Sequence, residues 1–198
     1  MPGFSFPPGF TIPTPRLQIS PFNPTDPTHC AFLVQLWNTD DFISSCGKTG
    51  ITTLEKAFSF LQGRVSEHYA YHGYGMFLVS RQTDDGMKLI GTVSLMRGIP
   101  PGPHYLAPDI GFAMLPEEGR KGYATEAAKG LLEYANGTLG VDAVFGFCSP
   151  VNQRSRGALE KIGMEFRGVR PLKVFGGGDN AVYVLPGMSD DLSVYNLD

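Results

Sequence analysis

The chain has 198 residues, 42% of them hydrophobic and 18% charged, and a formal net charge of −3. This composition is typical of a globular protein and excludes a disordered one. Without a long basic block, neither nucleic acid nor an anionic membrane is an expected partner, and no run approaches the ~18 apolar residues of a membrane span. The three scattered cysteines lack metal-ligand spacing, and the N-terminus lacks a signal-peptide pattern, so a cytoplasmic protein is expected.

The N-terminal third of the chain predicts an arm, a strand and two helices. Residues 1–15 carry five prolines and three phenylalanines, so they are expected to form an irregular arm that its aromatic rings could pin to the fold. Alternating apolar and polar residues predict a strand over 16–20. A helix is expected over 28–38. A second helix begins at the Thr52–Glu55 capping box and carries an apolar stripe made of Leu54, Ala57, Phe58 and Leu61.

The rest of the chain predicts six more strands and two more helices. Apolar strands over 74–81 and 88–96 flank Asp85-Gly86, a strong hairpin signal. The later elements are a strand over 109–115, a helix from Tyr123 to about Asn136, a strand over 141–149, a helix over 152–163, and strands over 164–174 and 181–185. The central strand–helix–strand unit must be parallel and right-handed. Together these elements predict one α+β domain over 16–185 with a mixed, mostly antiparallel seven-strand sheet, followed by a loose tail over 186–198.

The loop between the fourth strand and the next helix, Gly119-Arg120-Lys121-Gly122, is a candidate anion site. A helix that begins near Tyr123 has backbone N–H groups without intrahelical partners at the positive end of its dipole. Gly119 and Gly122 lack the Cβ atoms that would block an anion, and both tolerate positive φ. Arg120 and Lys121 add positive charge. The alternative is a solvated loop whose glycines serve only the turn, but the strand–loop–helix context favours the anion site.

Two other nucleotide-binding motifs fail on spacing. Gly47-Lys48-Thr49 could end a Walker loop, but Phe42 stands where the first glycine of that motif is required. The G-x-G-x-x-G pattern of dinucleotide sites follows none of the predicted strands, and no repeated βαβ pattern is present. P-loop and Rossmann-type nucleotide binding are therefore excluded.

Two stretches carry a resemblance to a known family: DIGFAMLPEEGRKGYATEAAKGLLEYA (109–135) and PVNQRSRGALEKIGMEFRG (150–168). They resemble the GNAT superfamily of N-acetyltransferases. The opening TPRLQISPF (14–22) is similar to the first strand of the branch that contains the ribosomal-protein N-terminal acetyltransferases. The resemblance spans about residues 14–185 in element order. It implies a GNAT-like acyl-CoA N-acyltransferase fold, with acetyl-CoA as co-substrate and no metal.

The family's phosphate-binding pattern, Q/R-x-x-G-x-G/A, maps onto residues 119–124. Gly119 stands where the family has Gln or Arg, and Arg120 replaces a family glycine, so the positive charge is displaced by one residue. The resemblance also implies that the backbone of residues 112–115 pairs with the pantetheine arm, and that an N–H near Met114 polarises the thioester carbonyl. The implied coenzyme-binding residues are Phe112, Met114, Leu115, Gly119, Arg120, Lys121, Gly122, Tyr123, Ala124, Thr125, Asn152 and Ser155.

Asn152 and Ser155 open the helix that follows Pro150. In the structural interpretation, Asn152 is an N-cap and Ser155 is a polar first-turn residue. The resemblance instead places Asn152 against the pantetheine and Ser155 near the thioester sulfur. Many family members have a tyrosine as general acid where this chain has Leu159, which cannot donate a proton. Ser155, or water bound to it, is then the remaining catalytic candidate for this step.

An alkylamine must lose a proton before it attacks, so the reaction needs a general base. Asp109 and His104 are the candidates, although Asp109 could be only a turn residue and His104 only a surface residue. Glu165 is a weaker candidate. The acceptor pocket could be floored by three loop residues, Tyr71, His72 and Tyr105.

The predicted function is transfer of the acetyl group of acetyl-CoA to a primary amine by direct attack in a ternary complex, since none of the cysteines is placed as an acyl carrier. The acceptor is expected to be a small molecule or a protein N-terminus. One alternative is a non-catalytic acyl-CoA-binding module, suggested by Leu159 and by the altered phosphate-binding pattern over residues 119–124. Another is an interaction domain, suggested by the arm and the tail. The aromatic arm could also pack on a partner subunit and give a homodimer.

Overall fold

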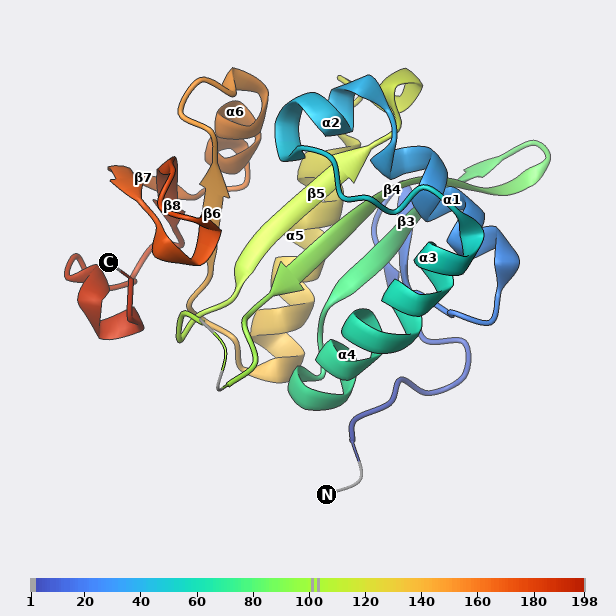
Figure 1. Ribbon diagram of the computed structural model, residues 1–198, viewed down its shortest axis with the longest axis horizontal. Helices are drawn as coiled ribbons and strands as arrows, with labels where there is room; N and C mark the ends of the chain where they lie inside the picture. The colour runs from blue at the N-terminus through green and yellow to red at the C-terminus, as the bar shows by residue number, and fades with distance from the viewer. Residues whose placement is uncertain (1–2, 101, 103, 198) are drawn as a thin grey trace.

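The computed structural model describes residues 3–100, 102 and 104–197 and contains one mixed sheet with helices on both faces (Figure 1). Its eight strands lie in the order β1-β2-β3-β4-β5-β6-β8-β7. The strands are β1 (Ile12–Pro13), β2 (Leu17–Pro21), β3 (Met76–Thr83), β4 (Gly86–Met96), β5 (Asp109–Met114), β6 (Phe145–Cys148), β7 (Glu165–Pro171) and β8 (Asp179–Val184). The α+β class is confirmed. The sheet has eight strands rather than seven, because the short β1 in the proline-rich arm pairs antiparallel with β2.

The helices cover the sheet from two sides. Within the described ranges they are α1 (Pro27–Trp37), α2 (Asp40–Cys46), α3 (Leu54–Phe60), α4 (Ser66–His72), α5 (Tyr123–Leu139) and α6 (Gln153–Lys161), with short turns η1 (Leu61–Val65), η2 (Pro116–Glu118), η3 (Lys173–Phe175) and η4 (Leu192–Tyr195). Figure 1 shows α3 and α4 in front of the sheet and α5 behind β4 and β5. None of the helices in these ranges is both long and apolar enough to span a membrane.

β5, α5 and β6 form the predicted parallel crossover. Asp109 pairs with Phe145 in parallel register, whereas the other neighbouring strands described in the sheet pair antiparallel. β3 and β4 form the predicted hairpin, with Thr83 opposite Gly86. The C-terminal end of β5 therefore leads through η2 and a short loop directly into the N-terminus of α5.

The segment between α1 and β3 differs from the prediction. The sequence pattern predicts no helix over 40–46, yet α2 forms there, and the Thr39 hydroxyl accepts a hydrogen bond from Phe42 N–H at 3.2 Å. α3 has Thr53 rather than Thr52 as its N-cap and continues through η1 into α4. Its predicted apolar stripe is half buried (Ala57 and Leu61) and half exposed (Leu54 and Phe58). Short helices without a complete apolar stripe give only a weak periodic pattern.

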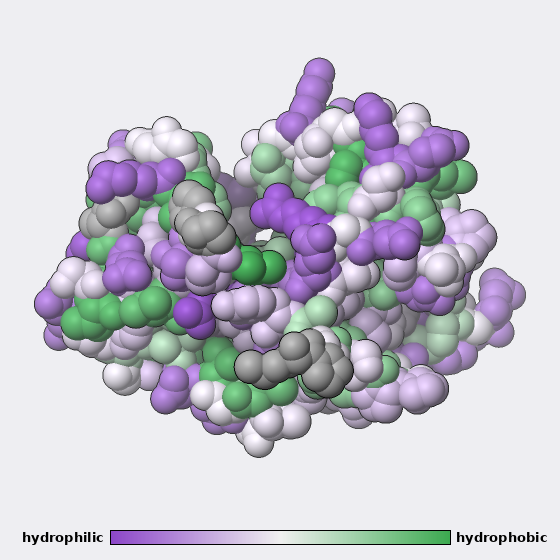
Figure 2. Space-filling view, turned by 60° about the horizontal axis from the view of Figure 1, so that its bottom comes forward, coloured by the Kyte–Doolittle hydropathy of each residue, from purple (hydrophilic) through white to green (hydrophobic). Residues whose placement is uncertain are grey.

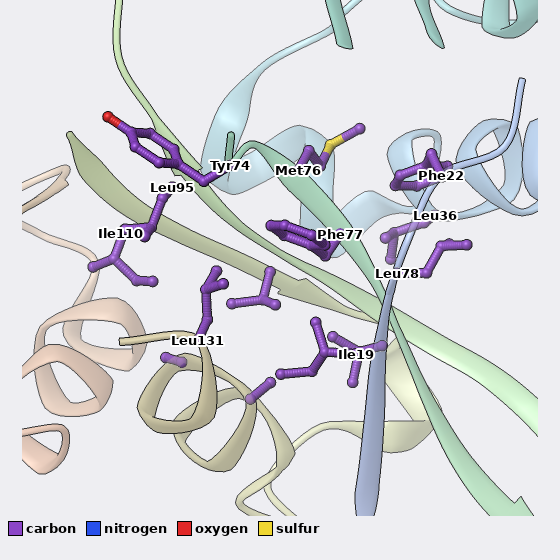
Figure 3. Packing of buried hydrophobic residues seen from close by; sticks show 14 of the residues in the cluster. Ile19, Phe22, Leu36, Tyr74, Met76, Phe77, Leu78, Leu95, Ile110 and Leu131 are labelled. Atoms are coloured by element: carbon purple, nitrogen blue, oxygen red, sulfur yellow. The ribbon is translucent and has the colours of Figure 1, made fainter. Parts of the chain in front are cut away.

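Apolar side chains hold the helices to both faces of the sheet. Figure 3 shows Leu131 of α5 on one side of the strands and Leu36 of α1 on the other. Both side chains are fully buried, as are Ile19 of β2 and Phe77 of β3. Because this packing fixes α5 against β4 and β5, it also fixes the position of the N-terminus of α5.

The two terminal segments, over their described residues 3–15 and 186–197, pack against the fold. The ring of Phe6 in the arm lies 5.1 Å from the ring of Tyr69 and 5.5 Å from that of Phe77, measured between centroids, so the arm is pinned by its aromatic residues. In residues 186–198, Met188 and Leu192 are buried in a second apolar cluster beside β6 and β8. This tail is packed rather than loose. Its buried residues are spaced irregularly, so no period in the sequence indicates them.

Candidate functional site

β5 and β6 separate after a short stretch of pairing and leave a cleft between them. In the described chain they pair only at Asp109 with Phe145 and at Ile110 with Gly146. From Gly111 onward, β5 borders a cleft of about 550 Å³ that is completed by α2, α6 and the loop before α5. Figure 2 shows a hollow between the two halves of the molecule. The edge of β5 that the resemblance assigns to the pantetheine arm therefore has no neighbouring strand after Ile110 among the described residues.

The backbone of β5 presents alternate residues to this cleft. Leu115 has no free backbone group, because its N–H donates to the Ile90 carbonyl at 2.8 Å and its own carbonyl accepts from Glu118 N–H at 2.9 Å. Since successive strand residues direct their N–H and C=O groups to opposite sides, Phe112 and Met114 direct theirs away from β4. Both residues line the cleft. Leu115 is thus removed from the predicted coenzyme-binding residues, whereas Phe112 and Met114 remain.

The helix after the loop begins at the predicted residue and is left uncapped. α5 starts at Tyr123, directly after Gly122, and no side chain caps it. The N–H of Glu126 bonds the carbonyl of Gly122 at 3.0 Å. The N–H groups of Tyr123, Ala124 and Thr125 therefore have no intrahelical partner. All three residues line the cleft, so this end of the cleft is a candidate anion cradle.

Positive φ falls on Arg120 and Gly122 rather than on both glycines of the loop. Gly119 is extended, with φ −67° and ψ 155°. Gly122 has φ +81°, and Arg120 has φ +62°, which costs an L-residue about 1–2 kcal/mol. The side chain of Arg120 is exposed and lines the cleft. Such strain persists where the surrounding structure fixes the backbone.

Lys121 does not line the cleft. Its ammonium donates to Glu118 Oε2 at 2.9 Å, and its carbonyl accepts from Arg16 Nη1 at 3.0 Å. The structure therefore directs the Lys121 ammonium to Glu118 rather than into the cleft. The motif alone does not indicate this position. Glu118 is only three residues from Lys121, but its carboxylate is held by Arg81 and Lys88 of the β3–β4 hairpin.

Two basic residues of α6 that the sequence analysis missed line the cleft, Arg154 and Lys161. Arg154 Nη1 also pairs with Asp41 Oδ2 of α2 at 3.0 Å and so connects the two walls of the cleft. The two residues are seven positions apart, which places them on one face of the helix. This spacing could have identified them in the sequence.

Asn152 and Ser155 line the cleft from the N-terminus of α6. Asn152 Oδ1 accepts a hydrogen bond from Ser155 N–H at 3.1 Å, so Asn152 is an N-cap, as the structural interpretation predicts. Ser155 is half-buried. Leu159, one turn further on, is fully buried, and a Cβ added at Gly146 would lie 2.6 Å from its Cδ2. Position 159 therefore belongs to the core and supplies no proton.

Asp109 lies at the opposite end of β5 from the cradle and is not among the residues that line the cleft, although its neighbour Ile110 is. Asp109 is not sealed from solvent, but the surrounding chain desolvates its carboxyl and raises its pKa to about 7. Burial also raises the pKa of Tyr74, and the charge of Asp109 adds to this shift. The structure thus separates Asp109 from Ser155, which stands in the cleft.

The aromatic residues expected at the acceptor pocket lie outside the cleft. Tyr71 is exposed on α4, whereas His72 stacks on Tyr74 with 5.3 Å between ring centroids. Burial lowers the pKa of His72 to about 4, so its ring is neutral at physiological pH. Because Tyr74 also interacts with the charge of Asp109, we refer to Asp109, Tyr74 and His72 as the acceptor end.

The other candidates from the sequence do not join the site. His104 Nδ1 lies 2.9 Å from the carbonyl of Gly102 in its own loop. Tyr105 is buried in the second apolar cluster rather than at the floor of a pocket. Glu165 is exposed on β7 and pairs with Arg167 at 2.8 Å. None of the three lines the cleft.

Comparison with known proteins assigns the family. The family model for the acetyltransferase (GNAT) domain matches residues 16–165. A curated relative from Bacillus subtilis (strain 168), the uncharacterized N-acetyltransferase YnaD, is 37% identical over 60 residues, which are 30% of this chain and 35% of the relative. The match therefore spans about a third of the length of that relative.

Solved structures agree in fold. The acetyltransferase (GNAT family) from Bacillus anthracis superposes with a TM-score of 0.68 at 22% identity, covering 89% of this chain and 98% of that chain. The ribosomal L7/L12 alpha-N-protein acetyltransferase RimL, in complex with coenzyme A, superposes with a TM-score of 0.69 at 20% identity, covering 88% of this chain and 97% of that chain. Because the family model extends from β2 to the start of β7, over more than half of the chain, the protein belongs to the acetyltransferase (GNAT) domain family.

Proposed function

We propose that the protein transfers the acetyl group of acetyl-CoA to a primary amine by direct attack in a ternary complex. The observation that carries this proposal is the course of the cleft, which follows the unpaired edge of β5 and ends at the uncapped N-terminus of α5. A free strand edge suits the amides of a pantetheine arm, and a free helix N-terminus suits a diphosphate. Coenzyme A joins these two groups in that order.

The end of the cleft at the N-terminus of α5, called the cradle end, offers groups of this chain that can bind the diphosphate. The N–H groups of Tyr123, Ala124 and Thr125 would hold its oxygens, and Gly122 carries no Cβ at the mouth. Arg120 at the rim would add a charge-assisted hydrogen bond worth about 1.5–3 kcal/mol. Affinity for the coenzyme is therefore proposed to depend mainly on the backbone of this loop.

The middle of the cleft would orient the acyl group. Bound acetyl-CoA supplies the activated acyl group for transfer. Phe112 and Met114 offer backbone groups to the pantetheine, and the N–H of Met114 is proposed to donate to the acyl oxygen, an interaction worth about 3–4 kcal/mol. From the opposite wall, the Ser155 hydroxyl would give or relay a proton to the departing sulfur, while Asn152 holds the first turn of α6 in place.

Asp109 is proposed as the general base. A carboxyl with a pKa of about 7 accepts a proton from an ammonium group at a pH where much of it is already ionised. Since the coenzyme would occupy the β6 side of β5, the amine would approach from the side of the acceptor end, past Tyr74 and His72. A base on that side need not line the coenzyme cleft.

The class of acceptor is proposed from the relatives. RimL is described as a ribosomal L7/L12 alpha-N-protein acetyltransferase, so a protein N-terminus is one proposed acceptor, and a small amine is the other. Neither nucleic acid nor a membrane is proposed as a partner. A cytoplasmic location and a homodimer formed through the arm remain proposals.

The test is calorimetric titration with coenzyme A, followed by turnover of acetyl-CoA across peptides with different N-termini, polyamines and amino sugars, with products identified by mass spectrometry. The proposal expects saturable binding and a mass increase of one acetyl group on at least one acceptor class. Binding without turnover on any class would support a non-catalytic coenzyme-binding module. No binding at all would refute the proposal.

A further inference from the structure

Glu118 is a buried carboxylate with three basic partners beside the cradle. It is 2% exposed. It accepts hydrogen bonds from Arg81 Nη2 at 3.0 Å, from Lys88 Nζ at 2.9 Å and from Lys121 Nζ at 2.9 Å. Burial opposes ionisation of this carboxyl, but the three hydrogen bonds outweigh burial and lower its pKa to about 2. Glu118 is therefore ionised throughout the physiological range and is unsuited to proton transfer.

The position of Glu118 makes it an anchor for the loop. It is the last residue of η2, and the loop 119–122 follows it directly. Arg81 belongs to β3 and Lys88 to β4, so the carboxylate ties the start of the loop to the β3–β4 hairpin. A lone carboxylate beside a diphosphate would repel it. Here three cations outnumber the two carboxylates, Glu118 and Glu117, so the cluster stays positive.

The far end of the loop has a second anchor, Arg16, which lies directly before β2. Arg16 Nη1 donates to the carbonyl of Lys121 at 3.0 Å, and Arg16 Nε pairs with Glu126 Oε2 at 2.6 Å. The guanidinium also lies over the ring of Tyr123, 4.7 Å from its centroid. The four residues between Glu118 and Tyr123 are thus held at both ends by side chains from segments that are distant in the sequence.

We propose that Glu118 is a positioning residue for the phosphate-binding loop: it fixes the loop against the β3–β4 hairpin and keeps the Lys121 ammonium away from the cleft, so that the backbone N–H groups bind the diphosphate. This inference rests on the proposed function and names a residue that acts through the loop. The left-handed conformation of Arg120 supports it, because a strained residue keeps its shape only where its neighbours fix it.

The decisive variant is Glu118→Gln, which keeps the shape of the side chain and removes its charge. We expect the Kd for coenzyme A, measured by calorimetry, and the KM for acetyl-CoA to rise together by about tenfold. The kcat at saturating acetyl-CoA should stay within about twofold of wild type. An anchor that served stability alone would lower Tm and leave Kd unchanged, and that result would overturn the proposal. A fall in kcat at unchanged Kd would overturn it as well.

Three further variants keep the test decisive if Glu118→Gln does not fold. Arg81→Met removes the anchor from the hairpin side and should raise Kd severalfold. Arg167→Met is the matched control. The Arg81 and Arg167 side chains are 25% and 26% exposed, and each substitution removes ion pairing with a glutamate. Arg167 lies on β7, away from the loop, so the Kd of Arg167→Met for coenzyme A should match that of wild type. Lys121→Met should keep Kd within about twofold, and a tenfold rise would assign the ammonium to the diphosphate and overturn the proposal.

The wild-type titration separates the two levels of inference. If wild-type protein binds no coenzyme A, the proposed function fails and the positioning role fails with it. If wild type binds and Arg81→Met behaves like Arg167→Met, the proposed function stands and the positioning role alone is refuted.

Discussion

The two ends of β5 are built in different ways. At its C-terminal end, the groups proposed to bind the coenzyme are consecutive backbone N–H groups over residues 123–125, set by one strand, one loop and one helix. At its N-terminal end, the acceptor end combines side chains from β5, from the turn before β3 and from α4. A backbone site on consecutive residues can be predicted from a local pattern, whereas a site assembled from distant side chains requires the tertiary structure.

Gly122→Val should break the cradle end and give the largest effect. A branched residue disfavours the φ of +81° at this position, and its Cβ would lie 3.3 Å from Arg16 Nη2 at the mouth of α5. We expect a loss of affinity for coenzyme A of at least about 10³-fold, measured by calorimetry at a temperature where the variant is folded.

Gly140→Val is the matched control for this loss. Gly140 caps the other end of the same helix with φ +66° and has open space around it. It should suffer a similar backbone penalty and a similar fall in Tm while it still binds coenzyme A as wild type does. Equal loss of binding in both variants would mean that the cradle assignment is wrong.

Asp109→Asn addresses the acceptor end and should have the second largest effect. Loss of a general base typically costs on the order of 10²-fold in rate, so kcat should fall by about that factor while the Kd for coenzyme A stays unchanged. Wild-type kcat should rise with pH through about 7, the raised pKa of Asp109, and the variant should lack this inflection. Normal kcat in the variant would limit Asp109 to a structural role at the start of β5.

The raised pKa of Asp109 also predicts that the free energy of unfolding changes with pH. The pKa of Asp109 is raised from 3.8 to about 7 in the folded protein, so the folded state holds a proton that the unfolded state has released between these values. Its contribution to the free energy of unfolding is therefore fully present below about pH 4 and is lost as the pH rises to about 7. Urea unfolding at pH 5 and pH 8 should show that Asp109→Asn stabilises the protein at pH 8 and has a smaller effect at pH 5.

Elements whose determinants are local could be predicted from the sequence. The strand over 109–115, the glycine loop and the helix from Tyr123 each follow from patterns within a few residues, and the structure has all three. Of the two interpretations of Asn152, the N-cap is confirmed, because capping is a local hydrogen bond, whereas its contact with the coenzyme stays a prediction. The parallel β5–α5–β6 unit followed from the rule that such crossovers join parallel strands.

Features that depend on residues distant in the sequence could not be predicted. Leu115 is removed from the cleft by Ile90 on β4, and Lys121 is turned toward a carboxylate that other strands surround. Neither the hydrogen bond to Ile90 nor the ion pair of Lys121 is implied by the motif. The packing of the tail likewise depends on apolar residues such as Met188, whose partners lie on β6 and β8.

Ser155→Ala tests whether the α6 wall takes part in the chemistry and should have a moderate effect. If the hydroxyl gives or relays a proton to the departing sulfur, kcat should fall about tenfold with little change in Kd. Ser155→Thr retains a hydroxyl and should keep more activity than the alanine variant. An unchanged kcat in Ser155→Ala would limit the residue to its backbone bond with Asn152.

Phe6→Ala should have the smallest effect on activity, because the arm belongs to neither end of the cleft. The Phe6 ring is half-buried and contacts Tyr69 and Phe77, so its removal should cost less than the 3–5 kcal/mol of a fully buried ring, about 1–3 kcal/mol. Urea unfolding should show this loss while Kd and kcat match wild type. Sedimentation of the same variant tests the proposed homodimer. A concentration-dependent dimer in wild type that is lost in Phe6→Ala would place the arm at a subunit contact. The same sedimenting mass in wild type and variant would assign the arm to intramolecular packing alone.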